Sequence, residues 1–206
     1  MKLSKYKPMT QKQLKDIVAD YASAFPEWTL ITDGVGFSRS VGPVTQLIWF
    51  QKMNYAAYRP THVVNTTALS MPRMLHQVLD VKSRETEYRL HESKWRSVLA
   101  AMEQQFKPAI RNPLEVAEVL KLCKAEARLS AANDLAMLAI LYAWEGLDAE
   151  AHDACDRMQK STPSTLAPIP EWEEKMQVFS KALSAAIDAG TGRQFIEKSI
   201  EESRAK

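Results

Sequence analysis

Apolar side chains near the start of the chain follow the period of a helix. They recur every three or four residues, at Leu14, Ile17, Val18, Tyr21 and Phe25. Thr10 and Gln13 precede most of them with the spacing of a helix capping box, and Pro26 follows them. We therefore expect a helix over residues 11–25.

The pattern then changes to the two-residue period of strands. Residues 28–32 and 35–41 predict two short strands on either side of Asp33-Gly34, a dipeptide typical of tight turns. Residues 44–53 predict the strongest strand. Its apolar side chains fall on both faces, at Leu47, Ile48, Trp49 and Phe50. This indicates a central strand that helices cover on at least one side.

The link after this strand, residues 54–60, is predicted to be a loop. Residues 61–68 are rich in Thr and Val and predict another strand, whose polar Asn65, Thr66 and Thr67 indicate a sheet edge or a half-exposed face. The links between strands are too short for the crossovers that parallel pairing needs. The simplest topology is therefore a helix followed by an antiparallel meander.

Strand patterns end near Pro72, and helical patterns fill the rest of the chain. Helices are expected over residues 73–81, 91–106, 131–144 and 172–188, with another after Asp148, which can cap it. Asn112-Pro113 has the features of a helix start, because Asn caps well and Pro suits the first helical position. Charged residues 82–87 are expected to be exposed, and proline-rich residues 161–170 to form a loop.

The predicted helix at residues 131–144 is apolar on most of its circumference. Two stripes together contain Leu135, Met137, Leu138, Ala139, Ile140, Leu141, Tyr142 and Trp144. A helix of this kind lies between other elements. The last residues, 197–206, are polar, and we expect a frayed tail there.

These elements predict an α+β protein. An N-terminal helix and a small antiparallel sheet take up residues 1–72, and a C-terminal helical bundle takes up residues 73–206. We expect the helical region to pack on the sheet, so that the two form one compact unit. A chain of 206 residues can bury about 70% of the surface of its unfolded form, so it needs no crosslinks.

Composition favours a globular protein, with 46% apolar and 25% charged residues. The net charge of +2 is too small to indicate nucleic-acid binding. Five lysines precede the first acid, Asp16, and form either a solvated surface or a contact for an acidic partner. The sequence has neither a long apolar run nor a signal segment, so we expect no membrane span and a cytoplasmic location. A toxin-like or secreted role by a signal-independent route stays open. Cys123 and Cys155 are expected to be buried thiols in a reducing compartment.

The sequence lacks motifs of known chemistry. The six glycines do not have phosphate-loop spacing, and the four histidines are too far apart for a local metal site. Residues 36–42 come near the Gly-x-Ser-x-Gly nucleophile motif without matching it. We expect no catalytic residue, no metal and no cofactor. An enzyme whose site is assembled from distant residues is the least favoured function.

Two segments resemble known families. Gly36-Phe37-x-Arg39, followed by an apolar strand and a Val-Val-Asn-Thr strand, resembles small bacterial domain families of unknown function over residues 28–72. Some members of such families are thought to be immunity or antitoxin-type binding proteins. Leu138-x3-Tyr142-x3-Gly146 resembles one tetratricopeptide-type hairpin over residues 135–158. No second copy follows at a fixed period, so a plain helical hairpin is favoured.

The candidate partner-binding residues lie in the expected loop at residues 54–60. They are Tyr55, Tyr58 and Arg59, and both residue types are enriched at binding hot spots. The alternative is that the tyrosines pack over the sheet edge. The sequence thus favours a binding protein of the immunity or antitoxin kind, which would occlude the active site of a protein partner. A helical adaptor that offers a groove to a peptide is the alternative. The oligomeric state stays open.

Overall fold

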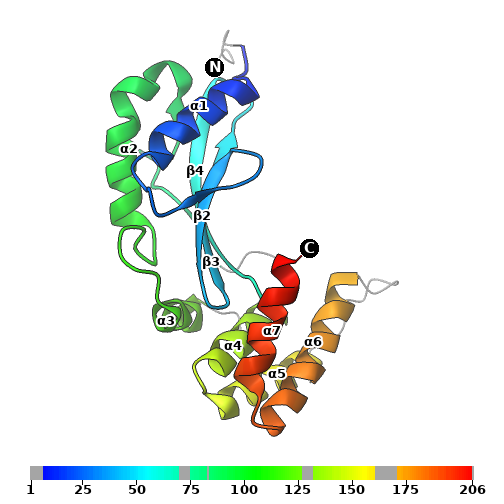
Figure 1. The fold of residues 1–206 in the computed structure, drawn as a ribbon. Helices are drawn as coiled ribbons and strands as arrows, with labels where there is room; N and C mark the ends of the chain where they lie inside the picture. The colour runs from blue at the N-terminus through cyan, green and yellow to red at the C-terminus, as the bar shows by residue number, and fades with distance from the viewer. Residues whose placement is uncertain (1–6, 70–74, 83, 127–131, 161–170, 206) are drawn as a thin grey trace. The chain divides into compact units, whose positions relative to one another are not determined.

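A computed structural model gives the fold of the chain and describes residues 7–69, 75–82, 84–126, 132–160 and 171–205. Contacts divide the chain into two units. The sheet unit comprises Met1–Arg39, Gln46–Val64 and Leu75–Leu114. The helical unit comprises Ser40–Thr45, Asn65–Met74 and Glu115–Lys206. The α+β class is confirmed (Figure 1). The division differs from the expected one at residue 72, because β5 (Leu75–Val78), β6 (Thr86–Glu87) and α2 (His91–Gln105) belong with the sheet.

The first helix, α1 (Gln11–Ala22), starts with the predicted capping box. Backbone N–H of Gln13 donates to Oγ1 of Thr10 over 3.2 Å, and backbone N–H of Thr10 donates to Oε1 of Gln13 over 2.8 Å. These two bonds satisfy donors that a helix start leaves without partners. The helix ends three residues before the expected Phe25, which is nevertheless buried.

The sheet is an antiparallel meander, as predicted. Its strands are β1 (Thr29–Leu30), β2 (Gly36–Val41), β3 (Val44–Lys52), β4 (Ala57–Thr66), β5 (Leu75–Val78) and β6 (Thr86–Glu87). The spatial order is β1-β2-β3-β4-β5, and β6 also pairs with β4. Alternation in β3 buries Ile48 and Phe50 and leaves Leu47 and Trp49 half-buried.

The expectations of a loop at residues 54–60 and of an edge strand after it are wrong. Strand β4 begins at Ala57 and lies inside the sheet, with β3 on one side and β5 and β6 on the other. Its register pairs Tyr58 with Thr86 and Thr61 with Val78, so Arg59 and Pro60 fall between the two pairings. Proline is tolerated in an interior strand at such a gap, because its missing N–H removes no ladder bond there.

The helix expected over residues 73–81 is also wrong, because residues 75–78 form strand β5. Leu75 and Leu79 are both buried. Residues four apart share a face in a strand as well as in a helix, so this spacing does not distinguish the two. Residues 82–87, expected to be exposed, include the short strand β6, in which Thr86 is buried.

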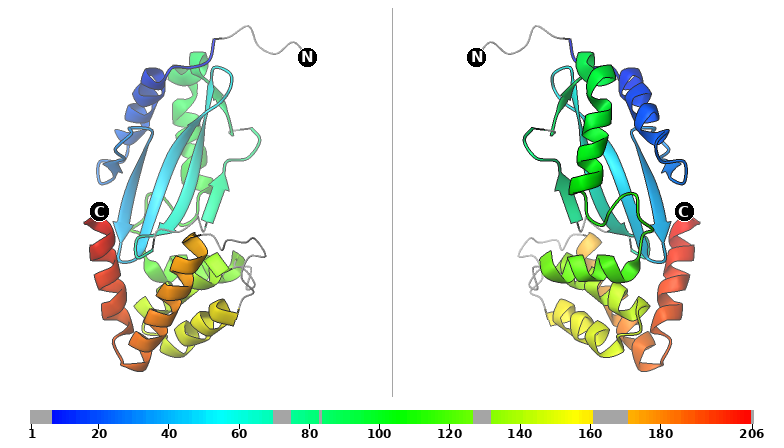
Figure 2. Two further views of the ribbon diagram at one scale, coloured as in Figure 1. Left: turned by 90° about the vertical axis from the view of Figure 1, so that its right-hand side faces the viewer. Right: turned by 90° about the vertical axis from the view of Figure 1, so that its left-hand side faces the viewer.

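Helices α1 and α2 (His91–Gln105) cover one face of the sheet, and a single turn of 3-10 helix at Tyr88–Leu90 precedes α2. In the right-hand view of Figure 2, α2 lies in front of the strands beside α1. Predicted stripe residues Val98 and Met102 are buried against this face. The centre of the core is aromatic, with Phe25 and Phe37 stacked at a centroid distance of 5.3 Å. Such pairs add about 0.5–1.5 kcal/mol beyond the burial of their area.

The helical unit contains α3 (Val116–Glu126), α4 (Ala132–Trp144), α5 (Asp148–Lys160), α6 (Glu171–Asp188) and α7 (Gly192–Arg204). Helix α4 contacts each of the other four helices. Its buried residues are Leu135, Ala136, Met137, Leu138, Ala139, Ile140, Leu141 and Ala143, as its all-round apolar pattern predicted. Stripes predicted for α5 and α6 are buried too, including Cys155 and Leu183.

Two helix boundaries and the tail differ from prediction. Helix α3 begins at Val116. Glu115 takes the cap position expected of Asn112, because its carbonyl accepts from the backbone N–H of Val119 over 3.2 Å. Asp148 is the first residue of α5 and not its cap. The frayed tail is wrong for residues 197–204, because buried Ile200 sits one turn after Ile196 and anchors α7. The loop expected at residues 161–170 lies outside the described residues.

Two further expectations concern the cysteines and membrane spans. Cys123 and Cys155 are free and buried, as predicted. Of the helices that the structure describes, none has the length and apolar character needed to cross a bilayer. Within the same residues, no three His, Cys, Asp or Glu side chains are grouped closely enough to hold a metal ion.

Gly42, at the turn between β2 and β3, packs against Trp144 of α4. Its φ is +50°, and an added Cβ would lie 2.6 Å from Cζ2 of Trp144. Gly42→Ala should therefore lower the free energy of unfolding by about 2–5 kcal/mol, through backbone strain and a steric clash. Gly190→Ala is the control, because Gly190 has a φ of +68° and no neighbour within 4 Å. Denaturant unfolding should show the larger loss for Gly42→Ala, and equal losses would contradict this packing.

Candidate functional site

The structure separates the three predicted contact residues. Tyr58 is fully buried in the core of the sheet unit. Its hydroxyl lies 2.9 Å from the hydroxyl of Tyr21 and 2.9 Å from Nδ1 of His91. Burial raises the pKa of Tyr58 to about 12 and raises the pKa of Tyr21 as well, so both stay protonated. Tyr58 therefore offers no surface to a partner in this structure.

Tyr55 and Arg59 both bind the carboxylate of Glu85. The hydroxyl of Tyr55 donates to one oxygen of Glu85, and Nη2 of Arg59 donates to the other. The Tyr55 side chain remains 39% exposed, and the Tyr88 side chain is 37% exposed. Backbone N–H of Tyr88 donates to the carbonyl of Ala56 over 2.8 Å, which places Tyr88 beside the same turn. A contact role for Tyr55 and Arg59 stays a prediction.

Loss of the buried hydroxyl should show in stability. Tyr58→Phe leaves Tyr21 and His91 without a partner at that position and should lower the free energy of unfolding by about 1–3 kcal/mol. Tyr88→Phe removes the same atom from an exposed side chain and should change stability by less than about 0.5 kcal/mol. Thermal unfolding of both variants tests this. Similar melting temperatures for the two would count against the hydrogen-bonded core.

A second polar network, which the sequence did not indicate, lies in the same unit. Nε of Arg39 donates to Oε1 of Gln46 over 2.7 Å, and Nη2 of Arg39 donates to the carbonyl of Ala109 over 3.0 Å. Nε2 of Gln46 donates to the carbonyl of Pro108 over 2.9 Å and lies 2.9 Å from Nε2 of His62. Gln46 shares a strand face with Ile48 and Phe50, and a polar residue on an apolar face is the signal that could have indicated this network.

The network holds His62 in its neutral form. Arg39 can only donate, so it orients the Gln46 amide with its nitrogen toward His62, whose Nε2 must then accept. Burial, with a smaller contribution from the nearby charge of Arg39, lowers the pKa of His62 to about 4, although the hydrogen bond to Gln77 opposes the shift. The ring also stacks on Phe106, with centroids 5.1 Å apart. His62 is therefore a structural residue of the core.

Stability should fall as the pH falls from about 6.5 to about 4. The unfolded chain binds a proton at His62 near pH 6.5, whereas the folded chain excludes it down to about pH 4, so acid favours unfolding by up to about 3 kcal/mol. His62→Gln should flatten this part of the pH profile of the free energy of unfolding. His152→Gln, at a half-buried position of α5, should keep the slope. Parallel profiles for the wild type and His62→Gln would refute the assignment.

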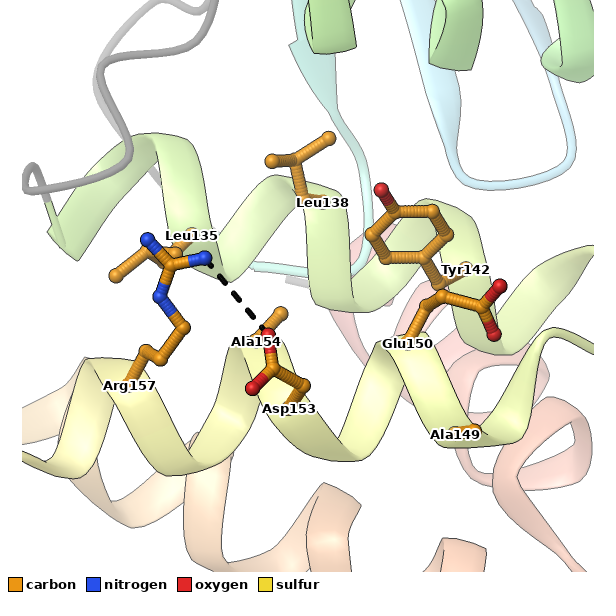
Figure 3. Close-up of a pocket in the computed structure, with 8 residues that line it drawn as sticks. All are labelled: Leu135, Leu138, Tyr142, Ala149, Glu150, Asp153, Ala154 and Arg157. Atoms are coloured by element: carbon orange, nitrogen blue, oxygen red, sulfur yellow. Dashed lines mark ion pairs between the residues drawn. The ribbon is translucent and has the colours of Figure 1, made fainter.

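The helical unit has a small pocket of about 330 Å³ between α4 and α5 (Figure 3). Its leucines, Leu135 and Leu138, are only 2% and 3% exposed. Its polar rim is largely occupied, because Arg157 lies 3.7 Å from Asp153 and the ammonium of Lys124 lies 5.5 Å from the ring centroid of Tyr142. This pocket therefore offers little apolar surface to a ligand.

A larger groove, of about 770 Å³, runs between α6 and α7. It is defined by Ala68, Leu69, Glu171, Glu174, Lys175, Val178, Phe179, Ala182, Phe195, Lys198, Ser199, Glu202 and Ser203. Val178 is 63% exposed, and Phe195 is half-buried with its ring 5.4 Å from that of Phe179. We call this the α6–α7 groove. It combines an apolar floor with charged sides.

Helical spacing explains how the groove forms. Met176, Phe179, Leu183 and Ile187 make the buried stripe of α6 that the sequence predicts. Val178 lies off that stripe, one turn after Glu174 and one turn before Ala182, so these three side chains line one wall. On α7, Phe195, Ser199 and Glu202 line the other wall at similar intervals. An apolar residue off the buried stripe is the signal that could have indicated this surface.

The groups whose pKa values burial shifts lie in the core. They are Tyr21, Tyr58, His62 and Cys155. In the groove, the pKa of Glu171 is lowered because the Lys175 ammonium donates to its carboxylate. The chemistry that the groove supports is therefore burial of apolar surface together with exposed ion pairing.

Comparisons of the chain with protein-family models, with curated proteins and with solved structures gave no match. The resemblances indicated for residues 28–72 and 135–158 therefore stay predictions. Over the second range, α4 and α5 form a helical hairpin whose turn contains Gly146, with a φ of +73°.

Proposed function

We propose that this chain is a non-catalytic binding protein whose α6–α7 groove takes up the apolar face of a helix from a protein partner. One observation carries the proposal. Val178 is 63% exposed on the α6 wall of a groove that Phe179 and Phe195 also line. An amphipathic helix laid into an apolar groove is a recurrent mode of peptide recognition. This is the adaptor function that the sequence left as an alternative.

The dimensions of the groove suit a short helix. Its wall on α6 runs from Glu171 to Ala182, which corresponds to about 16 Å at the rise of a helix. A partner helix of about three turns matches that length. Covering Val178 and the exposed edge of Phe195 would remove apolar surface from water, at roughly 25 cal/mol for each Å² buried. That gain supports a binding free energy without any reaction chemistry.

A second candidate is the immunity or antitoxin type of binding protein, which would occlude a bacterial partner's active site. The observation that favours it is the pair of exposed tyrosines, Tyr55 and Tyr88, at one turn of the sheet unit. Tyrosine is enriched at interface hot spots because it combines a large apolar area with a polar tip. This candidate places the contact surface on the sheet unit and not on the groove.

We also propose a cytoplasmic location. Its support is chemical, since Cys123 and Cys155 are both buried as free thiols. Proteins of oxidising compartments tend to pair their cysteines in disulfides.

Substitution of Val178 tests the proposed function. A displayed library of amphipathic helical peptides, with leucines at helical spacing and other positions random, is selected against the full chain. Selected peptides should bind Val178→Lys at least about tenfold more weakly than the wild type, because a charge would lie in the apolar wall. Val81→Lys changes the same residue type at an 84% exposed position of the sheet unit and should leave the Kd unchanged.

Two results would overturn the groove as the binding surface. One is a selection that yields no binder to the wild type. The other is a set of binders that Val178→Lys and Val81→Lys affect equally. If binders are instead lost on Tyr55→Ala or Tyr88→Ala, the second candidate is favoured.

A further inference from the structure

Charges in the α6–α7 groove are gathered at one end. Glu171, Glu174 and Lys175 come from the start of α6, and Lys198 and Glu202 come from the last turns of α7. The opposite end is lined by Ala182 and Phe195. A helix bound in the groove would therefore meet apolar surface at one end and carboxylates and ammonium groups at the other.

Within the part of the chain that the structure describes, one of these charges has no ion-pair partner. The Lys175 ammonium lies 2.6 Å from a carboxylate oxygen of Glu171, and the Lys198 ammonium lies 3.8 Å from a carboxylate oxygen of Glu202. No described residue forms an ion pair or hydrogen bond with the Glu174 side chain. Three carboxylates face two ammonium groups, so this end of the groove has an excess of one negative charge.

Glu174 also has a structural explanation. It lies in the first turn of α6, where a carboxylate stabilises the partial positive charge of a helix start by about 0.3–1 kcal/mol. That effect acts on the stability of the helix. It does not involve Val178, which lies one turn further along the same wall. Binding and stability measurements can therefore separate the two roles.

Resting on the function proposed above, we propose that the partner helix carries a lysine or arginine that pairs with Glu174. Glu174 and Val178 are four residues apart on one face of α6. A long basic side chain fits this arrangement, because its aliphatic stem can cover the exposed surface of Val178 while its charged end reaches the carboxylate. The partner is thus an amphipathic helix with a basic residue one turn beyond its apolar stripe.

A charge exchange tests this pairing. Three synthetic amphipathic helices are compared, identical except for Lys, Gln or Glu at one position a single turn beyond the last leucine. The Lys peptide should bind the wild-type chain about fivefold more tightly than the Glu peptide at low salt, and the difference should shrink at high salt. Glu174→Lys should reverse this order. Glu201→Lys, an exposed position of α7 outside the groove lining, should keep it.

The outcomes separate this inference from the proposed function. If no peptide binds the wild type, both fall. If all three bind equally and Val178→Lys abolishes binding, the groove stands and the pairing with Glu174 is wrong. Glu174→Gln is the second variant, for use if Glu174→Lys does not fold. It should bind the Lys and Glu peptides with equal affinity. A chain that self-associates through the groove, with Val178→Lys restoring the monomer, would overturn the inference in favour of a second copy.

Discussion

Helix α4 imposes the constraint on which the helical unit depends. Its buried side chains point in nearly every direction around the axis, so it must be enclosed, and α3, α5, α6 and α7 each contact it. The enclosing helices have apolar stripes of ordinary width, such as Met176, Phe179 and Leu183 on α6. Once these stripes are used, the remaining faces of α6 and α7 face solvent. The α6–α7 groove opens on those faces, and Phe179 of the buried stripe lines it as well.

In the sheet unit, two buried polar networks fix helix α2 at both ends. At the start of the helix, Tyr58 of β4 binds His91, the first residue of α2. After its end, His62 on the same face of β4 joins Gln46 and Gln77. Gln46 donates to the carbonyl of Pro108, and Gln77 accepts from the backbone N–H of Lys107. A purely apolar face would tolerate small shifts of α2 along the sheet. Hydrogen bonds at both ends favour a single alignment, since a buried donor or acceptor without a partner costs about 1–3 kcal/mol.

Periodicity predicted most elements because burial on one face leaves a regular signal, as for α1, β3 and the all-round apolar α4. It failed where two periods coincide or where partners are distant in sequence. Leu75 and Leu79 fit a helix and a strand equally well. Polar Asn65, Thr66 and Thr67 suggested a sheet edge, but β4 pairs on that side with β5 and β6, which come from later in the chain. Ile200 was overlooked because charged neighbours surround a single buried position.

The candidate site was harder to predict, since composition cannot tell a buried tyrosine from an exposed one. Tyr55 and Tyr58 have the same chemistry, yet one is 39% exposed and the other is fully buried. Val178 carries more information. Valine is a weaker helix former than alanine or lysine by up to about 0.7 kcal/mol, so local helix stability does not favour it at position 178. Its side chain is largely exposed, so the core does not need it either. Single exposed apolar residues are common, but Val178 lies in a groove beside Phe179 and Phe195. Burial of its side chain there would stabilise a complex with a partner.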